Sequence, residues 1–201
     1  MRSGSLGLGV GGDTLDPMIV LWIVLGLLVL AVLYLVFLYN GLVRLRNRIE
    51  AAWAQIDVQL RRRYDLIPNL VETVKGYAAH ERETLDSVTK ARAAAESATG
   101  PADQAAKENM LTQSLRSLIA VSEAYPDLKA NQNFLSLQEE LSATEGRIAY
   151  ARQYYNDTVQ RYNTKIQSFP AVLLAGALRF QPREYFEADD TSRGPVNVSF
   201  S

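Results

Sequence analysis

The chain has 201 residues, 48% hydrophobic and 21% charged, and its 21 basic side chains nearly balance 22 acidic ones. This length accommodates one compact domain and an appendage. The balanced charge disfavours a nucleic-acid partner, because neutralising phosphates requires a surplus of cations. The absence of cysteine excludes disulfides, zinc–thiolate sites and thiol nucleophiles, and the single histidine, His80, leaves little material for a metal site. We therefore expect neither metal nor cofactor.

The first strong feature is a stretch of 22 uncharged residues, 18–39, which follows a Gly-rich segment (residues 1–17) that we expect to be disordered. As a helix the stretch is about 33 Å long, enough to cross the ~30 Å hydrocarbon layer. Trp22 lies near one end and Tyr34 and Tyr39 near the other, as is typical of the two interfaces. A buried core helix is rarely apolar on every side, and a cleaved signal peptide has a shorter apolar region. We predict a retained transmembrane helix over residues 18–40.

The flanking charges predict the orientation of this span. Arg44, Arg46 and Arg48 follow it closely, whereas Arg2 is the only basic side chain before it. Basic residues are enriched on the cytoplasmic side of membranes. We therefore expect the N-terminus outside and the large C-terminal part in the cytoplasm, with the bilayer as a partner of the three arginines.

Beyond the span, the apolar spacing predicts helices almost throughout. The first stripe has three- and four-residue steps and comprises Leu42, Leu45, Ile49, Trp53, Ile56, Leu60 and Tyr64. Pro68 should break or kink this helix near Leu66. Helical spacing resumes at Leu70 and fades before the turn signal at residues 99–101. A third helix is expected from about Ala102 to Ala124, with Met110 or Leu111 in the core.

A seven-residue repeat predicts one long helix over residues 131–168, about 57 Å in length. Its apolar positions are Phe134, Leu141, Ile148, Tyr155, Tyr162 and Phe169. The positions four residues later are Gln138, Glu145, Arg152, Val159 and Ile166. A single charge on a buried stripe is costly unless it is paired. We expect Glu145 and Arg152 to form a buried polar layer with Asp57, Arg63 and Glu81 as candidates, and the alternative is that the stripe is partly exposed there.

Three asparagines lie close to the proline-containing turns: Asn69, Asn131 and Asn133. Asparagine there is typical of helix caps, and an interaction surface is the alternative. Residues 181–201 read as an irregular, flexible tail in which residues 195–200 alternate like a short strand. A lone strand is not stable, so it would pair with an edge or with another subunit.

These stretches resemble the LemA family. The resemblance rests on AW at residues 52–53, IDVQLRRRYDLIPNLVETVKGY at 56–77, YPDLKAN at 125–131, and the pairs Tyr155-Asn156, Tyr162-Asn163 and Phe169-Pro170. It extends from Tyr39 to Phe186. The resemblance implies a bacterial membrane protein with one N-terminal span and an antiparallel helical bundle, here residues 41–180. It implies no particular activity.

Candidate catalytic motifs are incomplete. His80-Glu81 begins like a metalloprotease HExxH helix, but residue 84 is threonine and no second histidine exists. The glycine-rich residues 7–12 lack the strand and the lysine of a phosphate-binding loop. We therefore identify no catalytic residue and do not expect an enzyme.

We expect an all-α, elongated bundle of about four long helices on a single N-terminal span in the bacterial inner membrane. The predicted function is a non-enzymatic scaffold that recruits an envelope protein and self-associates as a homo-oligomer. Two alternatives stay open: a sensor or receptor that binds a ligand or peptide between helices, and a cofactor of a membrane protease or other membrane enzyme.

Overall fold

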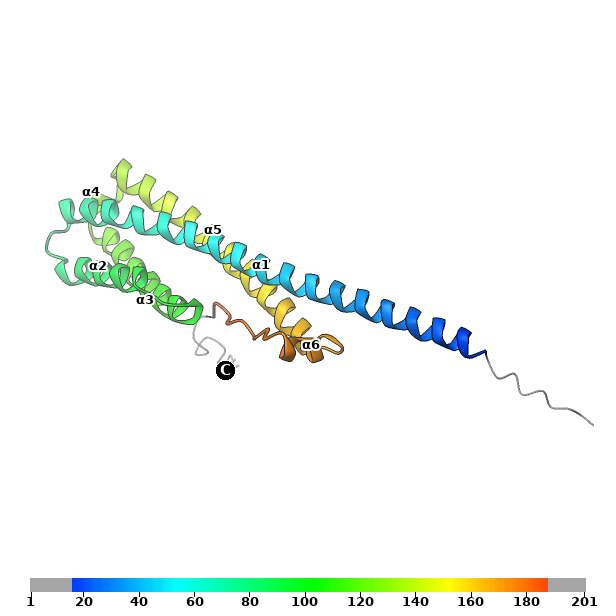
Figure 1. Cartoon of the computed structure of the whole chain (residues 1–201). Coiled ribbons are helices and arrows are strands. Elements are labelled where there is room, and N and C mark those ends of the chain that lie inside the picture. Colours follow the sequence, from blue (N-terminus) through cyan, green and yellow to red (C-terminus); the bar gives the residue numbers. More distant parts are fainter. Residues whose placement is uncertain (1–15, 188–201) are drawn as a thin grey trace, which may run out of the picture. The chain divides into compact units, whose positions relative to one another are not determined.

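The computed structural model of the chain describes residues 16–187 (Figure 1). The helices are α1 (Pro17–Tyr77), α2 (Arg82–Glu96), α3 (Pro101–Val121), the 3-10 helix η1 (Ser122–Ala124), α4 (Pro126–Lys129), α5 (Gln132–Gln167) and α6 (Ala171–Ala177). An irregular segment continues to residue 187. The described part contains helices and no strand, so the all-α prediction is confirmed. The Gly-rich segment up to residue 15 and the strand predicted at 195–200 lie outside the described residues.

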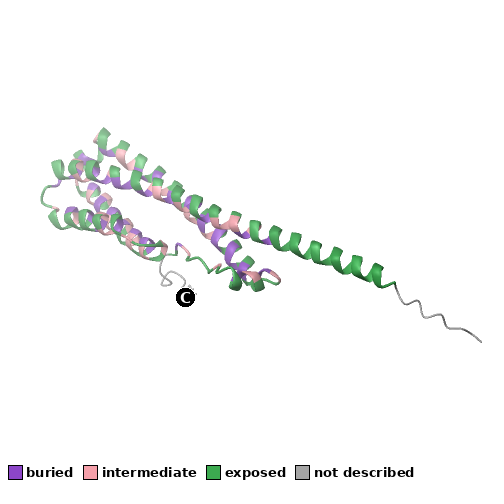
Figure 2. Ribbon diagram, viewed as in Figure 1, coloured by how far each residue is buried: buried purple, intermediate pink, exposed green. Residues whose placement is uncertain are grey.

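The chain divides into two compact units, Met1–Gly41 and Leu42–Ser201, and α1 contributes to both. In the first unit every residue from Asp16 to Phe37 is exposed (Figure 2). Eighteen consecutive residues of α1 reach a mean hydropathy of 3.1, and α1 is the one described helix that is long and apolar enough to cross a membrane. An apolar surface on all sides is typical of a helix in lipid. The stretch is not a buried core helix, and it is consistent with a single-pass membrane protein.

The second unit packs α1 (from Leu42), α2, α3 and α5 around one apolar core. α1 and α5 run antiparallel: Arg62 lies 4.0 Å from Glu140, and further back along α1 the Trp53 ring lies 5.5 Å from that of Tyr155. The apolar stripe of α1 from Leu42 to Tyr64 explains why this helix packs on the core, because apolar residues three and four apart share one helix face. In α3, Leu111 is buried and Met110 is exposed, which decides between the two.

The seven-residue repeat matches the buried face of α5 at its first five positions, Phe134 to Tyr162. The sixth position was predicted wrongly: Phe169 is 81% exposed. The reason is that α5 ends at Gln167, so Phe169 lies beyond the helix and next to Pro170. Of the second set of positions, Val159 and Ile166 are buried and the three polar ones are only partly so.

Of the break or kink predicted near Leu66, the break is wrong, because α1 continues through Pro68 to Tyr77. Proline removes the amide that would bond the carbonyl four residues earlier, here that of Tyr64. Arg92 of α2 donates from Nε to this carbonyl at 2.9 Å and replaces the lost helical bond. The chain turns instead at residues 78–81, between α1 and α2.

We expect Arg92→Leu to lower the free energy of unfolding by about 1–3 kcal/mol, because the part-buried Tyr64 carbonyl loses its partner. In a Pro68→Ala background the amide of residue 68 can donate to that carbonyl, so the same change should cost clearly less. Chemical denaturation of the four proteins measures the difference. Equal costs in the two backgrounds would contradict the pairing.

Candidate functional site

A buried ion-pair cluster joins three helices of the second unit. Arg63 of α1 is 1% exposed, and its Nη1 donates to Oε2 of Glu108 of α3 at 2.8 Å. Its Nη2 donates to Thr112 Oγ1 at 2.8 Å. Its Nε lies 2.9 Å from Oε1 of Glu145 of α5 without the alignment of a hydrogen bond, so this contact is mainly coulombic. One guanidinium therefore serves two carboxylates.

The second oxygen of Glu108 is occupied as well. The Tyr64 hydroxyl donates to Glu108 Oε1, and Gln104 Nε2 lies 2.9 Å from both oxygens of that pair. Burial, together with the neighbouring Glu108 carboxylate, raises the pKa of Tyr64 above its usual range, so its hydroxyl keeps the proton that it donates. Glu108 is 2% exposed. The Arg63–Glu108 part of the network is buried, and a buried hydrogen-bonded network stabilises one arrangement of the helices. At its edge Glu145 is partly exposed and lines, with Arg63 and Thr112, a cavity of about 320 Å³.

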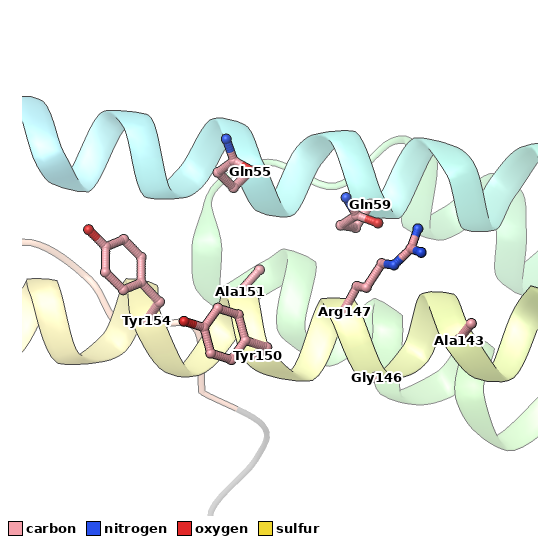
Figure 3. A pocket seen from close by; sticks show the side chains of 8 residues that line it. All are labelled: Gln55, Gln59, Ala143, Gly146, Arg147, Tyr150, Ala151 and Tyr154. Carbon is pink, nitrogen blue, oxygen red and sulfur yellow. The ribbon is translucent and has the colours of Figure 1, made fainter.

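A groove lies between α1 and α5 on the outside of the second unit, with a volume of about 570 Å³ (Figure 3). Its lining residues are Gln55, Gln59, Ala143, Gly146, Arg147, Tyr150, Ala151 and Tyr154. Figure 3 shows Arg147 reaching from α5 toward α1, with both glutamines on the opposite wall. The Gln59 Oε1 atom is buried and accepts no hydrogen bond within the described residues. The groove therefore combines a small-residue surface with polar groups that have spare bonding capacity.

The segment that follows α6 lies along α5 and is held by two asparagine side chains. Asn156 accepts from the amide of Phe186 at 2.8 Å and donates to its carbonyl at 3.0 Å. Asn163 does the same with Arg183, at 2.9 Å for both bonds. Seven residues of helix and three extended residues both span about 10 Å, so the two pairs stay in register. Each asparagine side chain thus forms with one backbone residue the pair of hydrogen bonds that a neighbouring strand would form.

One side chain anchors this segment. Phe186 is buried, its ring centroid lies 6.0 Å from that of Trp53, and the Arg152 guanidinium carbon lies 4.5 Å from the Phe186 ring centroid. A cation over an aromatic face is attractive, and more so away from water. The tail is therefore ordered as far as residue 187, in contrast to the flexible tail predicted from residue 181.

The family model described as the LemA family matches residues 52–200, which include the ion-pair cluster, the groove and the anchored segment. The chain belongs to the LemA family. Among its relatives, Protein LemA of Metamycoplasma hominis is 27% identical over 176 residues, or 86% of this chain and 80% of that protein. Magnetosome protein MamQ 2 of Paramagnetospirillum magneticum is 25% identical over 184 residues, 79% of this chain and 68% of that protein. Magnetosome protein MamQ of Magnetospirillum gryphiswaldense is 24% identical over the same shares.

In this LemA-family chain the expected polar layer is only partly assembled. The structure brings Arg63 and Glu145 together, whereas Arg152 turns to Phe186. Two members were predicted wrongly. Asp57 pairs with Arg61 one turn along α1, at 2.8 Å on the surface, because its position falls beside the buried stripe. Glu81 lies in the turn after α1 and accepts from the Tyr125 hydroxyl at 3.2 Å.

Of the three asparagines predicted as caps or contact residues, one caps a helix and two do not. Asn131 is the N-cap of α5 and accepts from the Phe134 amide at 3.0 Å, and it donates to the Tyr77 hydroxyl at 2.9 Å. Asn69 is no cap, because α1 continues past it. Asn133 is exposed in the first turn of α5, where the cap position is already taken by Asn131.

The membrane-flanking residues lie where the sequence placed them along α1. Trp22, Tyr34 and Tyr39 are exposed on its apolar part. Arg44 and Arg48 are exposed and Arg46 is half-buried at the start of the second unit.

Sequence reasoning missed Gln104 and Glu108 of α3. A signal existed: both fall on the buried stripe of that helix with Ala105, Leu111 and Leu115. It also missed the role of Asn156 and Asn163, although the Tyr-Asn pair repeats after seven residues. A groove lined by Gln55, Gln59 and Arg147 carries no sequence signal, because each residue looks like ordinary helix surface.

Glu145 gives the cluster a pH dependence. Burial raises the pKa of its carboxyl above the ordinary 4.5, although the Arg63 guanidinium opposes the shift. A raised folded-state pKa means that the folded chain holds the proton more tightly, so the contribution of Glu145 to stability is fully present below pH 4.5 and declines as the pH rises through the raised value. We expect Glu145→Gln to unfold with a weaker dependence on pH in that window, measured by urea titrations at several pH values. An unchanged dependence would assign the effect to other groups.

Proposed function

We propose that this chain is a membrane-anchored, non-catalytic scaffold whose helical unit binds a segment of another polypeptide in the groove between α1 and α5. The observation that carries the proposal is the groove itself, where Gln59 Oε1 is buried beside small side chains and has no partner among residues 16–187. A buried acceptor without a hydrogen bond costs free energy, and an incoming amide or hydroxyl donor would remove that cost.

The lining suits a helix or an extended peptide. Gly146, with Ala143 one turn before it, allows a backbone to approach α5 closely, and nothing lies within 4 Å of where a Gly146 Cβ would be. The side chains of Tyr150, Tyr154 and Arg147 make no hydrogen bond or ion pair within the described residues. Tyrosine and arginine are enriched at the energetic centres of protein interfaces. Apolar floor and polar rim together match helix-in-groove recognition.

A small ligand is the weaker alternative. Binding sites for small molecules bury about 70–90% of the ligand surface. Tyr150 is 75% exposed on the wall of this groove, and only two helices bound it. Such an open surface favours a polypeptide occupant over a sensed metabolite.

A membrane anchor would strengthen the binding of partner polypeptides by this chain. If the apolar part of α1 is kept in the bilayer, copies are confined to two dimensions, and weak contacts gain from a raised effective concentration. We propose that the chain self-associates and that its helical unit is cytoplasmic, as the basic residues after the span favour. The buried Arg63–Glu108 pair supports a structural rather than a catalytic role for the strongest charges. The names of the relatives designate a family or a cellular structure, the magnetosome, and specify no reaction.

Gly146→Leu tests this role without harming the helix. The added side chain enters open space in the groove, and replacing a mid-helix glycine stabilises by about 0.5–1 kcal/mol. Gly76→Leu is the matched control, because Gly76 also lies in a helix with nothing within 4 Å of its Cβ position, outside the groove lining. In intact membranes, chemical crosslinking of the wild type and the Gly76→Leu control should give the same products, and Gly146→Leu should lose them.

Crosslinking that returns only monomer for the wild type would refute recruitment. Products that survive Gly146→Leu would place the contact elsewhere than in the groove. Co-expression of two differently tagged copies distinguishes a second copy from another protein, since only self-association joins both tags.

A further inference from the structure

The short helix α6 shows the reverse of the usual pattern for a helix on a water-exposed surface. Its alanines Ala171 and Ala175 are buried against the unit. Its large side chain Leu173 is 68% exposed, and Phe169, which precedes the helix, is 81% exposed. Val172 and Leu178 are exposed too. Soluble proteins bury such residues, so four large apolar side chains gathered at one short segment indicate a surface made for an apolar partner.

This segment lies at the end of the second unit where the unit begins at Leu42. Arg46 of α1 lines a small cavity together with Tyr162, Arg179 and Phe180. α5 runs antiparallel to α1, so the five residues from Tyr162 to Gln167 advance about 7.5 Å beyond the level of Arg46. The four residues from Arg46 back to Leu42 cover about 6 Å. The start of α6 therefore lies at the level of Leu42, three residues after the predominantly apolar stretch 18–39 and two before the first charged residue, Arg44.

The charged residues closest in sequence to α6 and to the start of the unit are basic, up to Glu50 of α1, which pairs with Arg183. Residues 166–178 are 13 consecutive uncharged residues, bounded by Lys165 and Arg179. Residues 41–49 and 161–179 together contain six basic residues and no acidic one: Arg44, Arg46, Arg48, Arg161, Lys165 and Arg179. Uncharged apolar segments of this length with basic flanks are typical of interfacial elements, and cations near anionic lipid are attracted to the surface.

We propose that Phe169 and α6 insert into the interfacial layer of the same bilayer that the N-terminal span crosses, as a second, shallow membrane contact of the helical unit. Only a few residues of α1 separate this end of the unit from the stretch that enters the bilayer. The segment therefore reaches the headgroup region without a separate targeting step. Phe169, Val172, Leu173 and Leu178 enter the boundary between headgroups and acyl chains, and the basic residues remain at the phosphates. This contact does not depend on the α1–α5 groove or on its occupant.

The absence of cysteine from the chain makes the test clean. Leu173→Cys in the full chain is labelled with a nitroxide and reconstituted into vesicles of phosphatidylcholine and phosphatidylglycerol. Leu135→Cys is the control, an exposed apolar residue near the opposite end of α5. We expect the label at 173 to be accessible to oxygen and to lose accessibility to the water-soluble nickel complex NiEDDA, whereas the label at 135 stays accessible to NiEDDA. Phe169→Cys, with a side chain that packs on no core, repeats the measurement.

A label at 173 and 169 that is as accessible to NiEDDA as the one at 135 would overturn the proposal. So would labels shielded from both reagents with spin–spin broadening, which would identify a second copy as the occupant. Circular dichroism of each labelled protein confirms that the helices are retained, so loss of the fold cannot be taken for either result.

Discussion

Replacing Arg63 by methionine is expected to lower the free energy of unfolding of the helical unit by about 3–5 kcal/mol, because the change leaves the carboxylate of Glu108 buried without its charge partner. Both side chains of this pair are only 2% exposed, so water cannot compensate the loss. The measurement is denaturation of the full chain in detergent, followed through Trp53 fluorescence in a Trp22→Phe background.

Arg61→Met is the matched control, since Arg61 forms an exposed pair with Asp57 that should contribute no more than about 1 kcal/mol. The double variant Arg63→Met/Glu108→Leu should recover part of the stability, because it removes the buried carboxylate. The recovery is incomplete because Glu145 still loses Arg63, and Tyr64 and Gln104 lose Glu108. If Arg63→Met costs no more than Arg61→Met, the cluster does not hold the helices together.

The second large effect is expected at the tail. Phe186→Ala removes a fully buried ring from between Trp53 and Arg152, a loss of up to about 3–5 kcal/mol in a closed core. Because the segment can detach locally, part of this cost appears as release of residues 180–187 rather than as global unfolding. Limited trypsin digestion should therefore cut Phe186→Ala after Arg183 much faster than the wild type.

Gln181→Ala serves as the control for the tail, because Gln181 is exposed and lies in the same segment. Asn163→Ala should behave like Phe186→Ala to a smaller degree, since it removes both bonds to the Arg183 backbone. Equal cleavage of the wild type and Phe186→Ala would mean that the segment is not held by its aromatic anchor.

The features that could be predicted from the sequence are those that depend on residues close together in the chain. The span follows from composition alone, and α5 follows from the repeat that carries Phe134 to Tyr162, within one residue at each end. Both depend on helical periodicity, which needs no knowledge of neighbouring elements.

The features that were missed depend on partners distant in the chain. Pro68 stays inside a helix because Arg92, 24 residues later, bonds the Tyr64 carbonyl. Glu108 can be buried because it pairs with Arg63, which lies 45 residues earlier in the chain. Local rules for proline and for charged residues describe an isolated helix, and here a neighbouring helix supplies the missing bond or charge.

The most direct test of the proposed scaffold role is site-specific photo-crosslinking in intact membranes, with a photoreactive phenylalanine in place of Tyr150. The account predicts a discrete crosslinked polypeptide from this position, none from the same probe at Leu135, and loss of the product when Gly146→Leu fills the groove. A probe at 150 that captures no polypeptide, or one whose products match those at 135 and persist in Gly146→Leu, would contradict it.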